Sequence, residues 1–99
     1  MSQPGEDELL GLRASIDNLD VVLVFLMAER FKLTRAVGCL KARHDFPAVD
    51  PLREHAQVKR LRLLASESGL DPDSAEKLLG LVISEVIQHH QVMRQIGAR

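Results

Sequence analysis

The feature that most constrains this chain is a long row of apolar residues, spaced alternately three and four apart, that one basic residue interrupts. The row consists of Leu9, Leu12, Ile16, Leu19, Leu23, Leu26, Leu33, Val37 and Leu40. This spacing predicts one long helix whose apolar stripe packs against other helices. Arg30 stands within the stripe, and burying an unpaired charge costs several kcal/mol. We therefore expect Arg30 to face an anion, either a protein carboxylate such as Glu54 or Glu85 or an anionic ligand.

The predicted length of this helix has a consequence for assembly. The helix is expected to begin near residues 6–8, after Pro4 and Gly5, and to end at about His44. Some 36 residues at 1.5 Å each span roughly 54 Å, whereas a compact chain of this size is only about 33 Å across. Because such a stripe has to be covered by another chain, we predict an obligate, intertwined homodimer.

Two shorter helices are expected to follow. Asp50-Pro51 and Asp71-Pro72 each combine an N-cap residue with proline at the first helical position. Ser68-Gly69 ends the second helix, and the third extends to about Gly97. Strand signals are nearly absent. The predicted fold class is all-α, with one long and two shorter helices in a single domain over residues 1–99 and a core at about 7–95.

Charge and hydropathy exclude several kinds of partner. The chain has 13 Lys and Arg against 14 Asp and Glu, a net charge of -1, so no broad basic surface for nucleic acid or an anionic membrane is expected. Any anion site must therefore be local. The longest apolar run, residues 21–28, is too short to span a bilayer, and the start of the chain lacks the features of a signal peptide. We expect a cytoplasmic protein.

Cysteine and histidine usage gives no metal or cofactor site. The single cysteine, Cys39, is expected to be a small core residue. His89 and His90 are adjacent, so their rings diverge by about 100° on a helix and do not share a metal ion. His90 falls on the apolar face of the third helix, where it is either a core histidine or part of a binding site.

The cations near Arg30 have a spacing that suits a small polyanion. Arg30 and Lys41 are eleven residues apart, which places them on one helix face about 16 Å apart. Arg53 and Glu54 lie in the first turn of the second helix. Arg13 lies on another face, about 25 Å from Arg30, and would reach the Arg30 region of the other protomer in an antiparallel dimer.

Several short motifs, in this order and at this spacing, resemble the all-helical AroQ class of chorismate mutases. The motifs are Leu12–Asp20, Ala28–Arg30, Val37–Lys41, Asp50–Glu54, Gly69–Asp71 and Val82–Ile87. The resemblance covers nearly the whole chain. It implies an intertwined three-helix dimer that converts chorismate to prephenate by a cofactor-free Claisen rearrangement, in phenylalanine and tyrosine biosynthesis.

The resemblance also implies roles for individual residues. The family's arginines, which bind the two substrate carboxylates, fall on Arg13 of the partner subunit, Arg30 and Arg53. Lys41 would donate to the ether oxygen and to a carboxylate. Glu54 would accept the ring hydroxyl, and Asp50 would line that end of the site.

The third helix departs from the family pattern at two positions. A serine followed four residues later by glutamine is common in the family, and here these positions hold Val86 and His90. Val86 cannot hydrogen-bond a carboxylate. His90 can donate to the ether oxygen through one ring N–H, as the neutral tautomer or as imidazolium. Activity is therefore expected to depend on the protonation state or tautomer of His90.

Structural interpretations remain open for each of these residues. Asp50 is at least an N-cap, Lys41 suits the negative end of a helix dipole, and Arg13 is spaced to pair with Asp17. Arg53 and Glu54 would then be solvated first-turn residues.

Two other functions also remain open. One is an isochorismate-pyruvate lyase of the same helical family, which makes salicylate. The other is a non-catalytic helical regulatory or interaction module. Small mutases of this type also depend in some cases on a larger partner, the first enzyme of the aromatic pathway.

Overall fold

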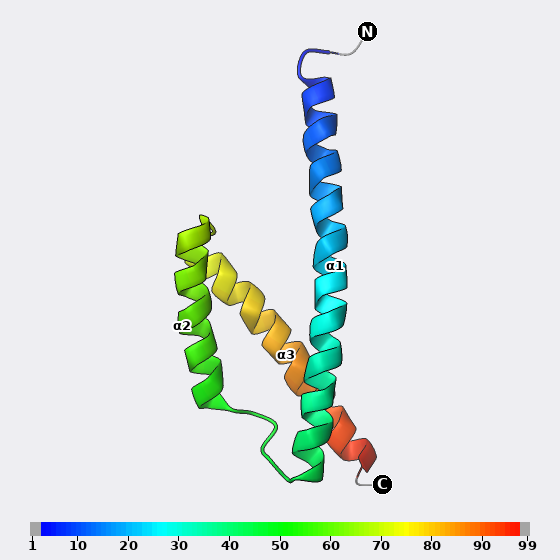
Figure 1. The fold of residues 1–99 in the computed structure, drawn as a ribbon, viewed down its shortest axis with the longest axis vertical. Coiled ribbons are helices and arrows are strands. Elements are labelled where there is room, and N and C mark those ends of the chain that lie inside the picture. The colour runs from blue at the N-terminus through cyan, green and yellow to red at the C-terminus, as the bar shows by residue number, and fades with distance from the viewer. Residues whose placement is uncertain (1–2, 98–99) are drawn as a thin grey trace. The chain divides into compact units, whose positions relative to one another are not determined.

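The computed structural model of the protein describes residues 3–97, apart from the side chains at positions 93, 94 and 97. This part of the chain forms three α-helices, α1 (Glu6–Arg43), α2 (Pro51–Ser68) and α3 (Pro72–Gly97), and contains no strand (Figure 1). The predicted all-α class and the predicted helix boundaries are confirmed. The ends of the predicted domain, residues 1–2 and 98–99, lie outside the described residues.

The chain divides into two compact units, Met1–Leu33 and Thr34–Arg99. The first unit holds the N-terminal part of α1, whose first turn carries three acidic residues that suit the positive end of the helix dipole. The apolar stripe of this part is exposed in the single chain, at Leu9, Leu12, Ile16, Leu19, Leu23, Leu26 and Leu33. None of the three helices, over the described residues, is long and apolar enough to cross a membrane.

The second unit contains the end of α1 together with α2 and α3, and local capping fixes where its helices begin. Asp50 Oδ1 accepts a hydrogen bond from the backbone N–H of Arg53 at 3.2 Å, and Pro51 occupies the first turn of α2. Asp71 Oδ2 accepts from the backbone N–H of Ser74 at 3.3 Å and caps α3 in the same way. Both predicted N-caps are confirmed, because each side chain satisfies an N–H that has no partner within its helix.

The ends of α1 and α2 share one geometry, in which a residue with positive φ turns the chain. Gly69 has φ 83°, and the N–H of Leu70 donates to the carbonyl of Ala65 at 2.9 Å. At the end of α1, Asp45 has φ 56° and the N–H of Phe46 donates to the carbonyl of Lys41 at 2.8 Å. Both ends therefore have the five-residue closure of a Schellman motif. At the end of α1, Asp45 stands in the place that glycine usually takes.

α2 packs against α3 through a small apolar core. Its buried apolar residues, within the described part of the chain, are Ala65 on α2 and Ala75 and Leu79 on α3. Two of the three are alanines, which leave little side-chain bulk between the helices. The remaining large apolar side chains of α2 and α3, among those that the structure describes, are half-buried or exposed in the single chain.

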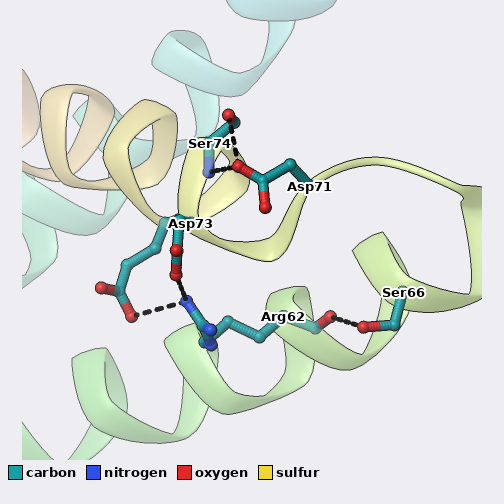
Figure 2. A network of polar contacts seen from close by, with 6 residues as sticks. Arg62, Ser66, Asp71, Asp73 and Ser74 are labelled. Carbon is teal, nitrogen blue, oxygen red and sulfur yellow. Dashed lines mark hydrogen bonds and ion pairs between the residues drawn. The ribbon is translucent and has the colours of Figure 1, made fainter.

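A polar network joins the two helices near the turn between them. Figure 2 shows Arg62 of α2 directed at Asp73 of α3, with Asp71 capping its own helix through Ser74. Arg62 Nη1 lies 2.9 Å from Asp73 Oδ1 and 3.6 Å from Glu76 Oε1. Because these side chains are 40% to 74% exposed, each pair contributes less than about 1 kcal/mol to stability.

The expectation that Cys39 is a core residue is wrong, because its side chain is exposed. The neighbouring Gly38 is the buried residue of α1. Successive residues of a helix point about 100° apart, so the face that buries Gly38 turns Cys39 away.

Candidate active site

Lys41 is tied to the loop that follows α1. Its half-buried side chain donates from Nζ to the carbonyl of Ala48 at 3.4 Å, while its own carbonyl accepts from Phe46. The side-chain hydrogen bond is long, and an ammonium group has three N–H donors. Lys41 therefore keeps donors for an anion even while the loop holds its side chain in place.

The first turn of α2 presents three polar side chains. Asp50 is exposed and uses one carboxylate oxygen for the cap, so its second oxygen remains open to another donor. Arg53 is exposed and Glu54 is half-buried. Neither Arg53 nor Glu54 forms a side-chain ion pair with another residue of the described ranges. Both are therefore available to a ligand.

An open groove of about 420 Å³ runs between α2 and α3. It is lined by Glu54, Val58, Glu76, Gly80, Ile83, Ser84 and Ile87. Its volume lies in the range of small-molecule pockets, which combine apolar walls with a few placed polar groups. Glu54 places a carboxylate at this groove, where it can accept a hydrogen bond from a small molecule that rests on the isoleucines.

His90 of α3 is buried, with 4% of its surface exposed. Its Nε2 lies 2.9 Å from the carbonyl oxygen of Thr34, and its Nδ1 is buried and has no hydrogen-bond partner among the described residues. The ring rests directly on Gly38. A Cβ at that position would lie 2.5 Å from His90 Cδ2 and 2.9 Å from Nε2, closer than real contacts allow.

The two arginines of the first unit differ in their environment. Arg13 is exposed. Arg30 is half-buried, and its Nη1 is buried with no hydrogen-bond partner among the described residues. No carboxylate in the described part of the chain therefore pairs with this nitrogen, although a buried guanidinium group needs an anionic or polar acceptor.

The second unit thus gathers part of the predicted site. Lys41 is joined to the loop that leads to Asp50, Glu54 shares a groove with α3, and His90 rests on the last part of α1. Val86 is half-buried and does not line the groove. His44, His55 and His89 are exposed, and the described residues contain no group of three or more potential metal ligands.

The sequence assigned no role in the site to Gly38, Ile83 or Ile87. The two isoleucines fall on the apolar spacing of α3, so they were indistinguishable from ordinary core residues. The signal for Gly38 was a glycine inside a helix, which costs about 1 kcal/mol relative to alanine and so needs a packing reason.

The family model for chorismate mutase type II matches residues 12–91, which include all eight predicted site residues. The chain belongs to the chorismate mutase type II family. The resemblance drawn from the motifs is thereby confirmed.

Relatives of this chorismate mutase type II domain include proteins of similar length and longer proteins. It is 28% identical over 89 residues to a chorismate mutase of Methanocaldococcus jannaschii, covering 90% of this chain and 86% of that protein. It is 31% identical over 81 residues to a 4-amino-4-deoxychorismate mutase of Streptomyces venezuelae, covering 82% of this chain and 79% of that protein. It is 37% identical over 78 residues to the T-protein of Enterobacter agglomerans, covering 79% of this chain but 21% of that protein.

The match to the longer proteins is partial. The chain spans about a fifth of the length of the T-protein and of a bifunctional chorismate mutase/prephenate dehydratase of Buchnera aphidicola, at 21% and 22%. The match is thus confined to a part of each of these longer proteins.

Proposed function

We propose that this protein is a chorismate mutase that rearranges chorismate to prephenate without a cofactor, in phenylalanine and tyrosine biosynthesis. The observation that carries the proposal is the buried Nη1 of Arg30, which has no partner among the described residues. In a member of the chorismate mutase type II family, a carboxylate of the substrate is the acceptor that this nitrogen lacks. The cytoplasmic location expected from the sequence stays a prediction.

The reaction suits a site made of cations and apolar walls. It is a concerted rearrangement, which needs neither a nucleophile nor an obligatory proton transfer. Holding the flexible ether in its reactive conformation removes part of the entropic barrier. Cationic donors near the ether oxygen stabilise the negative charge that develops there as the C–O bond breaks.

We assign the residues as follows. Arg30, Arg53 and Arg13 of the partner subunit bind the two carboxylates, and Lys41 and His90 donate to the ether oxygen. Glu54 accepts the ring hydroxyl, which is supported by its place at the groove beside Ile83 and Ile87. Asp50 lines the same end, and Val86 contributes an apolar contact at the site.

The substrate is tested by supplying the purified chain with chorismate, isochorismate and 4-amino-4-deoxychorismate in turn. We expect prephenate from chorismate, with a kcat/KM at least about tenfold above that for either competitor. Glu54 is proposed to accept from a hydroxyl at one ring position, and isochorismate carries its hydroxyl at a different position while 4-amino-4-deoxychorismate has an amine there instead. Salicylate and pyruvate from isochorismate would instead identify a lyase. Preference for the 4-amino compound would assign the activity of the Streptomyces relative, and no turnover would favour a non-catalytic module.

We further propose an intertwined homodimer, in which each site takes Arg13 from the other chain. The exposed apolar stripe of α1 supports it, because monomeric proteins rarely leave so continuous an apolar surface open to water. We also propose a larger enzyme of the aromatic pathway as a partner, whose addition to the assay would raise turnover.

The shared site predicts complementation between two inactive variants. Arg13→Ala and Arg30→Ala chains are each expected to be nearly inactive alone. When they are coexpressed, half of the dimers are mixed, and each mixed dimer has one site with both arginines intact. About a quarter of the wild-type activity should return in the mixture. Activity that stays at the level of the separate variants would show that Arg13 acts within its own chain or not at all.

A further inference from the structure

We propose that Thr34 and Gly38 position His90 so that its ring donates a hydrogen bond to the substrate only as imidazolium, which couples substrate binding to the uptake of a proton. The inference rests on the proposed function, because it concerns a donor to the substrate. Thr34 and Gly38 are positioning residues, since they act through the histidine.

The contact with Thr34 fixes which ring nitrogen carries hydrogen. His90 Nε2 lies 2.9 Å from the carbonyl oxygen of Thr34. A carbonyl oxygen only accepts hydrogen bonds, so Nε2 is the donor. A neutral ring has one N–H, which is therefore committed to Thr34. The other nitrogen, Nδ1, then carries a lone pair and can accept but not donate.

Gly38 makes this contact possible. The ring occupies the space that a side chain at position 38 would take, since an added Cβ would lie 2.5 Å from Cδ2 and 3.3 Å from Cγ. The carbonyl of Thr34 and the N–H of Gly38 are partners in the i to i+4 ladder of α1. The absence of a side chain at Gly38 leaves the second lone pair of that carbonyl open to the ring.

The remaining nitrogen has the character of a ligand-binding atom. Nδ1 is buried without a partner, in a residue that is only 4% exposed. Burial keeps bulk water away, so a bound molecule is the source of a partner for Nδ1. The ether and carboxylate oxygens of the proposed substrate only accept hydrogen bonds. Nδ1 must therefore carry a proton to bind them, and with Nε2–H retained the ring is a cation.

The described charged residues near the ring are cations. The elements that hold the ring are α1 and α3. Their charged residues nearest in register are Arg30 and Lys41, one turn before Thr34 and one turn after Gly38, and both are basic. The side chain of Arg94, one turn after His90 in sequence, lies outside the described residues. A bound dicarboxylate adds two negative charges, which offset these cations and stabilise the imidazolium.

The coupling is tested by the pH profile of kcat/KM for chorismate. The wild-type value is expected to fall about tenfold per pH unit along the limb of the profile on which the doubly protonated ring is lost. His90→Gln should show a flat profile over the pH range of that limb, because the amide keeps its N–H donors at every pH. His89→Gln removes the neighbouring imidazole and is the matched control, which should keep the wild-type profile. A flat wild-type profile would overturn the inference.

The tautomer is tested without turnover, by nitrogen-15 NMR of the histidine side chains in the wild-type protein. We expect the neutral ring of His90 to carry its proton on Nε2. A neutral ring protonated on Nδ1 would contradict the inference directly. If the wild-type protein forms prephenate with a flat pH profile of kcat/KM, only this inference is overturned. If the wild-type, His90→Gln and His89→Gln proteins all fail to form prephenate, the proposed function is overturned and the inference with it.

Discussion

Replacing Arg30 with alanine is expected to lower kcat/KM for chorismate by about a thousandfold. The change removes a guanidinium group whose Nη1 is buried and without a partner among the described residues, so a substrate carboxylate bound there would be left unpaired. Leaving one member of a buried ion pair alone costs about 3–5 kcal/mol, and a free energy of this size corresponds to the expected fall of about a thousandfold in kcat/KM. Most of the effect should be in KM, because the carboxylate is present in substrate and transition state alike. The measurement is prephenate formation at increasing chorismate concentration.

Two further variants separate charge, geometry and folding. Arg35→Ala removes an exposed arginine from the same helix and should leave kcat/KM within about twofold of wild type. Arg30→Lys keeps the charge but loses the planar fork, so an intermediate loss of roughly ten- to a hundredfold is expected. If Arg30→Ala folds with wild-type helicity and keeps its activity, the anion site lies elsewhere.

Gly38→Ala is expected to lower the free energy of unfolding by about 2 kcal/mol and kcat/KM by about a hundredfold. The added methyl group would lie 2.5 Å from His90 Cδ2, so the ring has to move away from the Thr34 carbonyl. Overpacking of this kind costs about 1–3 kcal/mol, and displacing a donor by about 1 Å costs on the order of a hundredfold in rate. Denaturant unfolding and the mutase assay measure the two effects.

A double-mutant cycle identifies the origin of that cost. In the His90→Ala background the ring is absent, so adding Gly38→Ala should no longer destabilise the protein. Gly11→Ala is the matched control, because an added Cβ at Gly11 meets nothing within 4 Å. It should stabilise the helix by up to about 1 kcal/mol. An equal loss of stability from Gly38→Ala in both backgrounds would show that the clash with His90 is not the cause.

The helices could be read from the sequence because their ends are specified locally. Asp50-Pro51 and Asp71-Pro72 begin α2 and α3, and Gly69 ends α2, through hydrogen bonds that span at most five residues. Such signals act within one turn of the chain. The end of α1 was found only approximately, because its positive-φ residue is Asp45 instead of glycine.

The site was less predictable where it depends on contacts between distant residues. His90 and Thr34 are 56 positions apart, and no spacing rule connects them. The choice between a core histidine and a donor therefore stayed open, and the structure shows a buried ring with one satisfied nitrogen and one unsatisfied nitrogen. Cys39 was misplaced for a related reason. An apolar neighbourhood in sequence does not tell which side of the helix meets α3.

Lys41 is held by the loop through both its carbonyl and its ammonium group, and this limits how that loop can be changed. The N–H of Phe46 binds the carbonyl of Lys41, and the carbonyl of Ala48 binds its Nζ. Adding or deleting a residue between positions 42 and 48 would break one of these bonds or shift the cation. Loop grafting or directed evolution of this protein should therefore keep the number of residues in that segment fixed and vary only the side chains that point outward.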